Sequence, residues 1–142
     1  MPRLSRNFLQ MNVETLMPQP KYHRGGIYRI TLPRQMYTID PDGKNIQRLG
    51  HECCDPHLCL VVSTDEFNQA RSGLVVLPLT SKTGQPQKPF WVRVRCDGEA
   101  AYVLCEQIRY VDLERCGKHH GDLMPHEMVW IENKLRTLMS LK

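Results

Sequence analysis

Two histidines and one glutamate are the side chains of this sequence best suited to moving a proton near neutral pH. His57 stands directly before an apolar run, and His51 lies six residues earlier in a polar segment. Glu106 follows a later apolar run. An imidazole titrates near neutrality, and partial burial raises the pKa of a carboxyl group. Glu106 and His57 therefore suit acid–base chemistry, and His51 could contact a phosphate. An ion pair of Glu106 with Arg109 and a structural histidine at a strand end remain open alternatives.

Hydroxyl, cationic and aromatic side chains that could bind an anionic ligand stand near other strand-like runs. Thr80 and Ser81 end the run at 73–79, where hydroxyls could bind phosphate oxygens or simply form a turn. The segment 90–96 alternates apolar residues with Trp91, Arg93 and Arg95, so these three share one strand face. With Lys82 and Lys88, the arginines could form a basic track, and the indole could stack on a base. An ordinary solvated face explains the cations equally well.

The bulk properties predict one domain without a membrane segment. The 142 residues can bury a core, and 19 Lys+Arg against 15 Asp+Glu give a net charge of +4, a weak sign of a nucleic-acid partner. No apolar run approaches the roughly 18 residues that span a bilayer, and the N-terminus lacks the apolar stretch of a secretion signal. We therefore expect a cytoplasmic protein with no membrane partner.

The six cysteines are expected to be mostly free thiols, because the cytosol is reducing. Cys59 and Cys105 lie in apolar runs and are expected in the core. His51, Cys53, Cys54 and His57 could suggest zinc, but adjacent cysteines rarely point at one ion. We therefore expect neither a metal nor a cofactor.

The apolar patterns predict short strands in series, followed by one helix. Residues 33–56 are polar and turn-rich, with a turn at Pro41-Asp42-Gly43, and are expected to form a hairpin in part or to cover a cleft. A short helix is expected after Ser63 or Thr64, ending before Gly73. His119 and His120 are interpreted as loop surface. The predicted strands cover 27–32, 58–63, 73–79, 90–96 and 100–107, and the C-terminal helix covers about 124–140 with Pro125 in its first turn.

These elements predict a mainly β fold, a small barrel or half-open roll with a C-terminal α-helix. Residues 1–22 are expected to be an N-terminal extension, because Pro18 and Pro20 end any helix there. Residues 23–142 are expected to form the barrel domain.

Several segments, taken in order, resemble the MazF/PemK/Kid toxin family. Each motif is weak alone, but their ordered series is fairly specific and covers roughly residues 24–141. The matching segments are Gly25-Gly26-Ile27-Tyr28, Gly50-His51-Glu52, Leu60-Val61-Val62-Ser63, Phe67-Asn68, Pro78-Leu79-Thr80-Ser81, Pro89-Phe90 and Glu106-Gln107-Ile108-Arg109-Tyr110-Val111-Asp112.

The resemblance implies a fold, an activity and partners. The fold is a small SH3-like barrel of the CcdB/PemK type with a C-terminal helix. The activity is that of a type II toxin–antitoxin toxin, a sequence-selective, metal-independent endoribonuclease that cleaves single-stranded mRNA through a 2′,3′-cyclic phosphate. The implied partners are single-stranded RNA, an acidic antitoxin peptide that blocks the RNA groove, and a second copy in a homodimer.

The resemblance also implies roles for individual residues. The catalytic residues are His51, His57, Thr80 and Glu106; the RNA-binding residues are Glu52, Ser81, Lys82, Trp91, Arg93 and Arg109. The sequence departs from the family at two places. The positions of the usual Arg-Pro pair are occupied by His57 and Leu58, and the position at which some members carry a further arginine is occupied by Leu104. The alternative function is therefore a non-catalytic binding module on the same barrel, either like a gyrase poison or a relative that has lost cleavage.

Overall fold

The computed structural model describes residues 21–33, 38–39, 45–47, 53, 55–81 and 89–142. Most of the predicted N-terminal extension and the predicted turn at 41–43 lie outside these residues. Tyr22, which the prediction assigned to the extension, is buried, with its ring centroid 4.9 Å from that of Tyr28.

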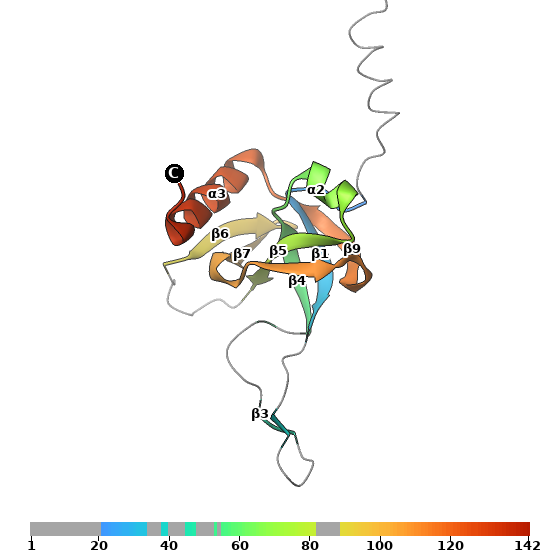
Figure 1. Ribbon diagram of the computed structural model, residues 1–142. Coiled ribbons are helices and arrows are strands. Elements are labelled where there is room, and N and C mark those ends of the chain that lie inside the picture. Colours follow the sequence, from blue (N-terminus) through green and yellow to red (C-terminus); the bar gives the residue numbers. More distant parts are fainter. Residues whose placement is uncertain (1–20, 34–37, 40–44, 48–52, 54, 82–88) are drawn as a thin grey trace, which may run out of the picture.

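Seven antiparallel strands form the body of the protein (Figure 1). Their order in the sheet is β6-β7-β5-β4-β1-β9. β5 pairs with β7 at its C-terminal residues Leu79 and Thr80, and with β8 at its N-terminal residues 73–76. The prediction of a mainly β fold with a C-terminal helix is confirmed. The strands are β1 (Gly26–Leu32), β4 (Asp55–Val61), β5 (Gly73–Thr80), β6 (Trp91–Cys96), β7 (Glu99–Leu104), β8 (Arg109–Asp112) and β9 (Cys116–Asp122).

Two central strands, β4 and β5, carry apolar residues on both faces because each face packs into its own core. β1 packs Tyr28, Ile30 and Leu32 into one core but exposes Arg29 and Thr31 on its other face. In β4, Leu60 packs into one cluster and Cys59 and Val61 into the other. The first cluster extends over β6, β7 and the C-terminal helix, and the second lies among β1, β4, β5 and β8. Strands buried on both sides read as continuous apolar runs, which is the pattern of residues 58–63 and 73–79.

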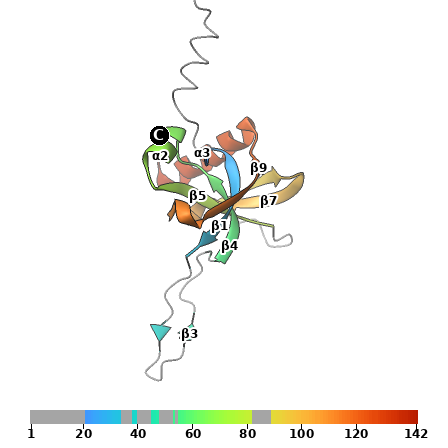
Figure 2. The same cartoon turned by 90° about the vertical axis from the view of Figure 1, so that its right-hand side faces the viewer.

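Two predicted hairpins are present. β6 and β7 pair through Asp97 and Gly98, both with positive φ (51° and 79°), as a tight two-residue hairpin turn requires. In the polar segment, β2 (Thr38–Ile39) pairs with β3 (Asn45–Gln47). This small hairpin extends away from the body (Figure 2).

Two α-helices of the described residues lie where they were expected. α2 (Asp65–Ala70) starts with Thr64, whose hydroxyl accepts a hydrogen bond from the amide of Phe67. α3 (Pro125–Met139) has its proline in the first turn and packs on β6 and on the 3₁₀ turn η1 (Cys105–Gln107). Among the described helices, none combines the length and apolar character needed to cross a membrane.

The segment after β7 differs from the prediction. The strand expected over 100–107 ends at Leu104, and Glu106 lies in η1. β8, the 3₁₀ turn η2 (Leu113–Arg115) and β9 follow, although β9 was interpreted as loop around His119 and His120. The sequence of β9, CGKHHGD, has no apolar alternation, because this edge strand packs little of its length into a core.

Candidate functional site

Two predicted catalytic residues, His57 and Thr80, are neighbours on adjacent strands. Cys59 of β4 lies opposite Pro78 of β5, and continuing this antiparallel register by two residues places His57 opposite Thr80. Both side chains are partly buried and both make contacts within the protein. The fold therefore brings together two residues that are 23 positions apart in the sequence.

A pocket of about 370 Å³ lies at the ends of β4 and β5, where these two residues stand. Ser81 and Arg29 also line it, so an imidazole residue, two hydroxyl residues and one arginine border the same hollow. Arg29 lies opposite Leu58 rather than His57, so its side chain is on the other face of the sheet from that of His57. The remaining lining residues are apolar: Pro56, Leu58, Leu79 and Ala101. A cation and neutral donors around a small hollow are the groups that bind a phosphate.

Arg29 is the residue that sequence reasoning missed. It was noted only as an interruption of the first strand, where it lies opposite Leu58 of β4. A charged residue within an otherwise largely apolar strand-like run was the available signal. Arg29 is the arginine that lines the pocket together with His57.

The pairing continues from this pocket across the sheet. Thr80 lies opposite Tyr102 of β7, and Tyr102 lies opposite Arg93 of β6. Directly opposed residues share a face, so His57, Thr80, Tyr102 and Arg93 form one row across four strands. Trp91 stands two residues from Arg93 on that face, with its ring centroid 5.9 Å from that of Tyr102. We call these five residues the cross-strand row.

Glu106, the predicted base, is not among the residues that line the pocket. It is exposed in η1, and its Oε1 accepts a hydrogen bond of 2.9 Å from Nε1 of Trp91. The carboxylate therefore lies at the Trp91 end of the cross-strand row, while His57 lies at the other end. The structure thus links Glu106 to a predicted RNA-binding residue, and the predicted ion pair with Arg109 is not among the ion pairs found in the described part of the chain.

Arg109 also lies away from the pocket lining. It is on β8, opposite Val76 of β5, and its charge favours the thiolate of the buried Cys59. Burial nevertheless raises the pKa of Cys59 to about 12, and it does the same for Cys105. Both are fully buried, as predicted, and such thiols are unsuited to nucleophilic attack. The five described cysteines form no disulfide.

Three predicted site residues, His51, Glu52 and Lys82, lie outside the described residues, and their roles stay predictions. The possible zinc site of His51, Cys53, Cys54 and His57 is likewise outside them in part. Of the other candidates, the structure brings together His57, Thr80 and Ser81 at the pocket, and Trp91, Arg93 and Glu106 at the far end of the cross-strand row.

Solved structures share this fold. MazF from Deinococcus radiodurans superposes with a TM-score of 0.66 at 20% identity, covering 87% of this chain and 99% of that one. An endoribonuclease from a mycobacterial species gives 0.62 at 23%, covering 88% and 95%. A mycobacterial endoribonuclease in complex with its cognate antitoxin gives 0.61 at 23%, covering 84% and 96%. Structural similarity at these low sequence identities establishes the fold alone.

Comparison with family models establishes more than the fold. No curated protein matches this sequence. The model described as "PemK-like, MazF-like toxin of type II toxin-antitoxin system" matches residues 24–139, which is most of the chain. This chain therefore belongs to the PemK-like, MazF-like family of toxins of type II toxin–antitoxin systems.

Proposed function

We propose that this protein is a toxin that cleaves single-stranded RNA without a metal ion, at the pocket formed by His57, Thr80, Ser81 and Arg29. The observation that carries the proposal is the placement of His57 beside Thr80 in a pocket of about 370 Å³ of a toxin-family barrel. Structural relatives named as endoribonucleases support the reaction class.

Metal-independent cleavage uses the 2′-hydroxyl of the RNA as the nucleophile. The hydroxyl oxygen attacks the adjacent phosphorus, the bond to the 5′-oxygen breaks, and a 2′,3′-cyclic phosphate and a 5′-hydroxyl result. One group must accept the 2′ proton, one must protonate the leaving oxygen, and donors must stabilise the charged phosphorane. RNA specificity follows, because DNA lacks the nucleophile.

The pocket supplies most of these groups. His57 as an imidazolium protonates the leaving 5′-oxygen, and the hydroxyl of Thr80 and the guanidinium of Arg29 stabilise the phosphate oxygens. Arg29 provides a guanidinium, which stays charged throughout the accessible pH range. We propose that the hydroxyl of Ser81 donates a further hydrogen bond to the phosphate.

The base is proposed to be Glu106, a role that follows from the family motif Glu106-Gln107-Ile108-Arg109. Its carboxylate is exposed and hydrogen-bonded to Trp91. It lies three strand spacings of about 4.8 Å from His57 along the cross-strand row, so these two side chains of one chain do not meet at a single phosphate. Its position outside the pocket lining offers a specific alternative in which neutral His57 itself accepts the 2′ proton and Arg29 alone carries the charge. The pH profile distinguishes the two.

The cross-strand row is proposed as the path of the RNA. From the pocket, Tyr102 and Trp91 offer aromatic faces for bases, and Arg93 offers a charge to the backbone. Arg93 and Arg95 are exposed, as the alternation predicted. Arg109, His51, Glu52 and Lys82 remain proposed contacts on the strength of the family motifs.

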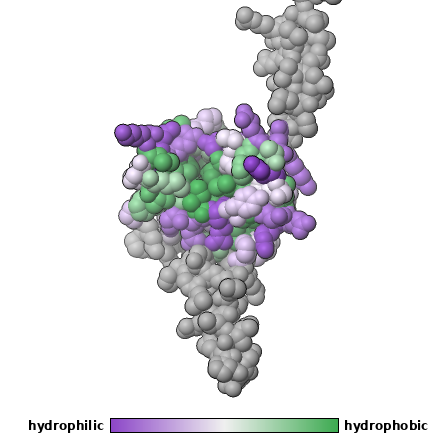
Figure 3. Space-filling view, in the orientation of Figure 1, coloured by the Kyte–Doolittle hydropathy of each residue, from purple (hydrophilic) through white to green (hydrophobic). Residues whose placement is uncertain are grey.

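The partners are proposed to be a second copy of the chain and an acidic antitoxin. Hydrophobic surface is visible between α3 and the strands (Figure 3), and α3 exposes Val129 and Trp130 to solvent. A groove of about 400 Å³ between β6 and α3 joins Trp91 and Trp130 to the cations Arg93 and Lys134. Its composition suits an acidic peptide with apolar side chains. A homodimer and a cytoplasmic location are proposed with it.

The alternative function is a binding module that keeps this groove and does not cleave. The specific observation in its favour is the histidine at the family's arginine position. This alternative predicts that the protein binds RNA or another protein and leaves RNA uncleaved.

Defined single-stranded RNA incubated with the purified protein in EDTA tests the proposal. We expect fragments with 2′,3′-cyclic phosphate and 5′-hydroxyl ends, formed equally with and without EDTA. Intact RNA under all conditions, together with cleavage by His57→Arg, would establish the binding module instead. A 2′-deoxy substitution at the cut position is the matched substrate control and must stay uncleaved.

A further inference from the structure

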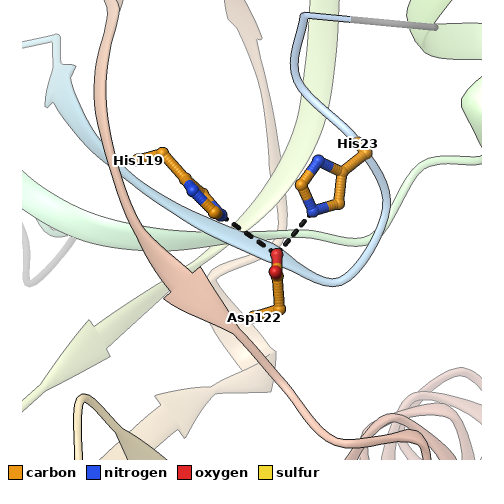
Figure 4. A group of neighbouring side chains, drawn as sticks. All are labelled: His23, His119 and Asp122. Atoms are coloured by element: carbon orange, nitrogen blue, oxygen red, sulfur yellow. Dashed lines mark hydrogen bonds and ion pairs between the residues drawn. The ribbon is translucent and has the colours of Figure 1, made fainter.

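Two histidines and an aspartate gather on the surface of β9 and the segment before β1, away from the pocket. Nε2 of His23 lies 2.5 Å from Oδ1 of Asp122, and Nε2 of His119 lies 3.0 Å from the same oxygen. The ligand atoms of the three residues all lie within 4.8 Å of one another. Figure 4 shows both imidazole rings directed at one carboxylate.

The backbone is built so that these residues face each other. Positions three apart in a regular strand point to opposite faces, which would separate His119 from Asp122. The pairing of β9 with β1 changes register between Ile27 and Tyr28, and Gly121 between the two ligands has φ of 148°. The irregularity turns both side chains to one side, and bulges commonly re-aim side chains in this way.

Tyr28 orients one of the rings. Its hydroxyl lies 2.9 Å from Nδ1 of His23 and also accepts a hydrogen bond from the amide of His23. Tyr28 is 3% exposed, so the hydroxyl is fixed, and its ring lies 4.9 Å from that of His119. A partner on the second nitrogen of a histidine is the usual outer support of a metal ligand, since it leaves Nε2 for the ion.

We propose that His23, His119 and Asp122 form a binding site for one divalent transition-metal ion, with zinc as the ion used to test it. Two imidazoles and one carboxylate are a ligand set that zinc accepts, with water in the fourth position. The ion replaces the Nε2–H···Oδ1 hydrogen bonds, and in each neutral ring the proton moves from Nε2 to Nδ1, so the tautomer changes without net proton loss. Nδ1–H of His23 then donates to the Tyr28 hydroxyl.

The site joins the edge strand β9 to the chain entering β1. Ion binding therefore stabilises the end of the sheet that is next to the N-terminal segment. Because none of the three ligands lines the pocket or belongs to the cross-strand row, this role is separate from RNA cleavage and stands whether or not the chain cleaves RNA.

Isothermal titration of the EDTA-treated, chelator-free full chain with zinc chloride tests the site. We expect one zinc per chain and a higher melting temperature with zinc. His119→Ala and the isosteric Asp122→Asn should each weaken binding about 100-fold or more, and Tyr28→Phe about 10- to 100-fold, as expected for loss of an outer-shell partner. The double variant Cys53→Ser/Cys54→Ser should bind as the wild type does.

His120→Ala is the matched control, because His120 is adjacent to His119 but faces Asp97. It should bind zinc as the wild type does. With cobalt in place of zinc, the absorption spectrum should lack a sulfur-to-cobalt charge-transfer band. The proposal is overturned if the wild type takes up no zinc, if Asp122→Asn binds unchanged, or if the Cys53→Ser/Cys54→Ser variant loses the ion.

Discussion

The indole of Trp91 and the carboxylate of Glu106 are joined by a hydrogen bond of 2.9 Å between Nε1 and Oε1. The bond connects β6 to η1, so it fixes an exposed carboxylate against the strand that carries Arg93 and Arg95. An aromatic ring and an anion are thus held together at one end of the cross-strand row, 15 residues apart in sequence. The first predictions concern this row.

Trp91→Ala should weaken binding of single-stranded RNA by about tenfold or more, because stacking on an aromatic ring contributes roughly 1–3 kcal/mol per base. Trp91→Phe keeps a ring and should lose less. Fluorescence anisotropy with an uncleavable 2′-O-methyl RNA measures both. Tyr110→Ala removes another exposed aromatic ring, on β8, and should bind as the wild type does. Equal affinities for all variants would exclude Trp91 from the RNA path.

His57→Ala should remove cleavage and leave RNA binding nearly unchanged, because the variant lacks the proton donor but keeps the row. His57→Arg should restore cleavage, and its activity should not decline at alkaline pH, since a guanidinium stays charged. Wild-type activity should fall as pH rises above neutrality, where imidazoles lose their charge. Gel-based initial rates between pH 5 and 9 test this. If His57→Ala cleaves normally, the histidine is structural and His51 is the next residue to replace.

Glu106→Gln should abolish cleavage without unfolding the protein, because an amide cannot accept the 2′ proton. The wild-type pH profile should then be bell-shaped, with one limb from the base and one from the acid. If Glu106→Gln is active and the profile rises with pH on a single limb, neutral His57 is the base. Trp91→Phe serves as the control that frees the carboxylate but keeps its charge.

Glu127→Gln should destabilise the fold by about 1.5–3 kcal/mol, the typical net contribution of a hydrogen bond to a charged group. Glu127 is 5% exposed; one oxygen accepts from the amide of Met124 and the other from the amide of Arg95, so it joins α3 to β6. The glutamine amide turns one acceptor into a donor that faces an N–H group. Urea denaturation measures the change, and Glu99→Gln, an exposed control on β7, should alter it little.

Gly98→Ala should cost about 1–2 kcal/mol, because an L-residue resists the left-handed backbone that Gly98 adopts at φ 79°. A Cβ there meets nothing within 4 Å, so any loss measures backbone strain alone. Gly98→Asn should retain more stability, since asparagine tolerates this conformation. Thermal unfolding of the three proteins gives the comparison, and unchanged melting for Gly98→Ala would contradict the turn.

By itself, the sequence determined the elements with strong periodic patterns. The apolar runs before and after α2, the alternation of β6 and the Met and Leu stripe of α3 gave strands and helices because burial on one or two faces imposes their period. The turn at Asp97-Gly98 and the cap at Thr64 were equally local, since each depends on neighbouring residues only. The ordered motifs also led to the toxin family.

Only the tertiary structure decided what stands beside what. The strand register places Thr80 next to His57, and the pocket that they line includes Arg29 but not Glu106. The sequence could not predict this, because spacing along the chain does not encode which strands pair. The tertiary structure also gives His119 a partner in Asp122, whereas the sequence predicts loop surface at this position. An edge strand without apolar alternation gives no periodic signal, so β9 and its His-Asp cluster emerge only when the strand is paired with β1.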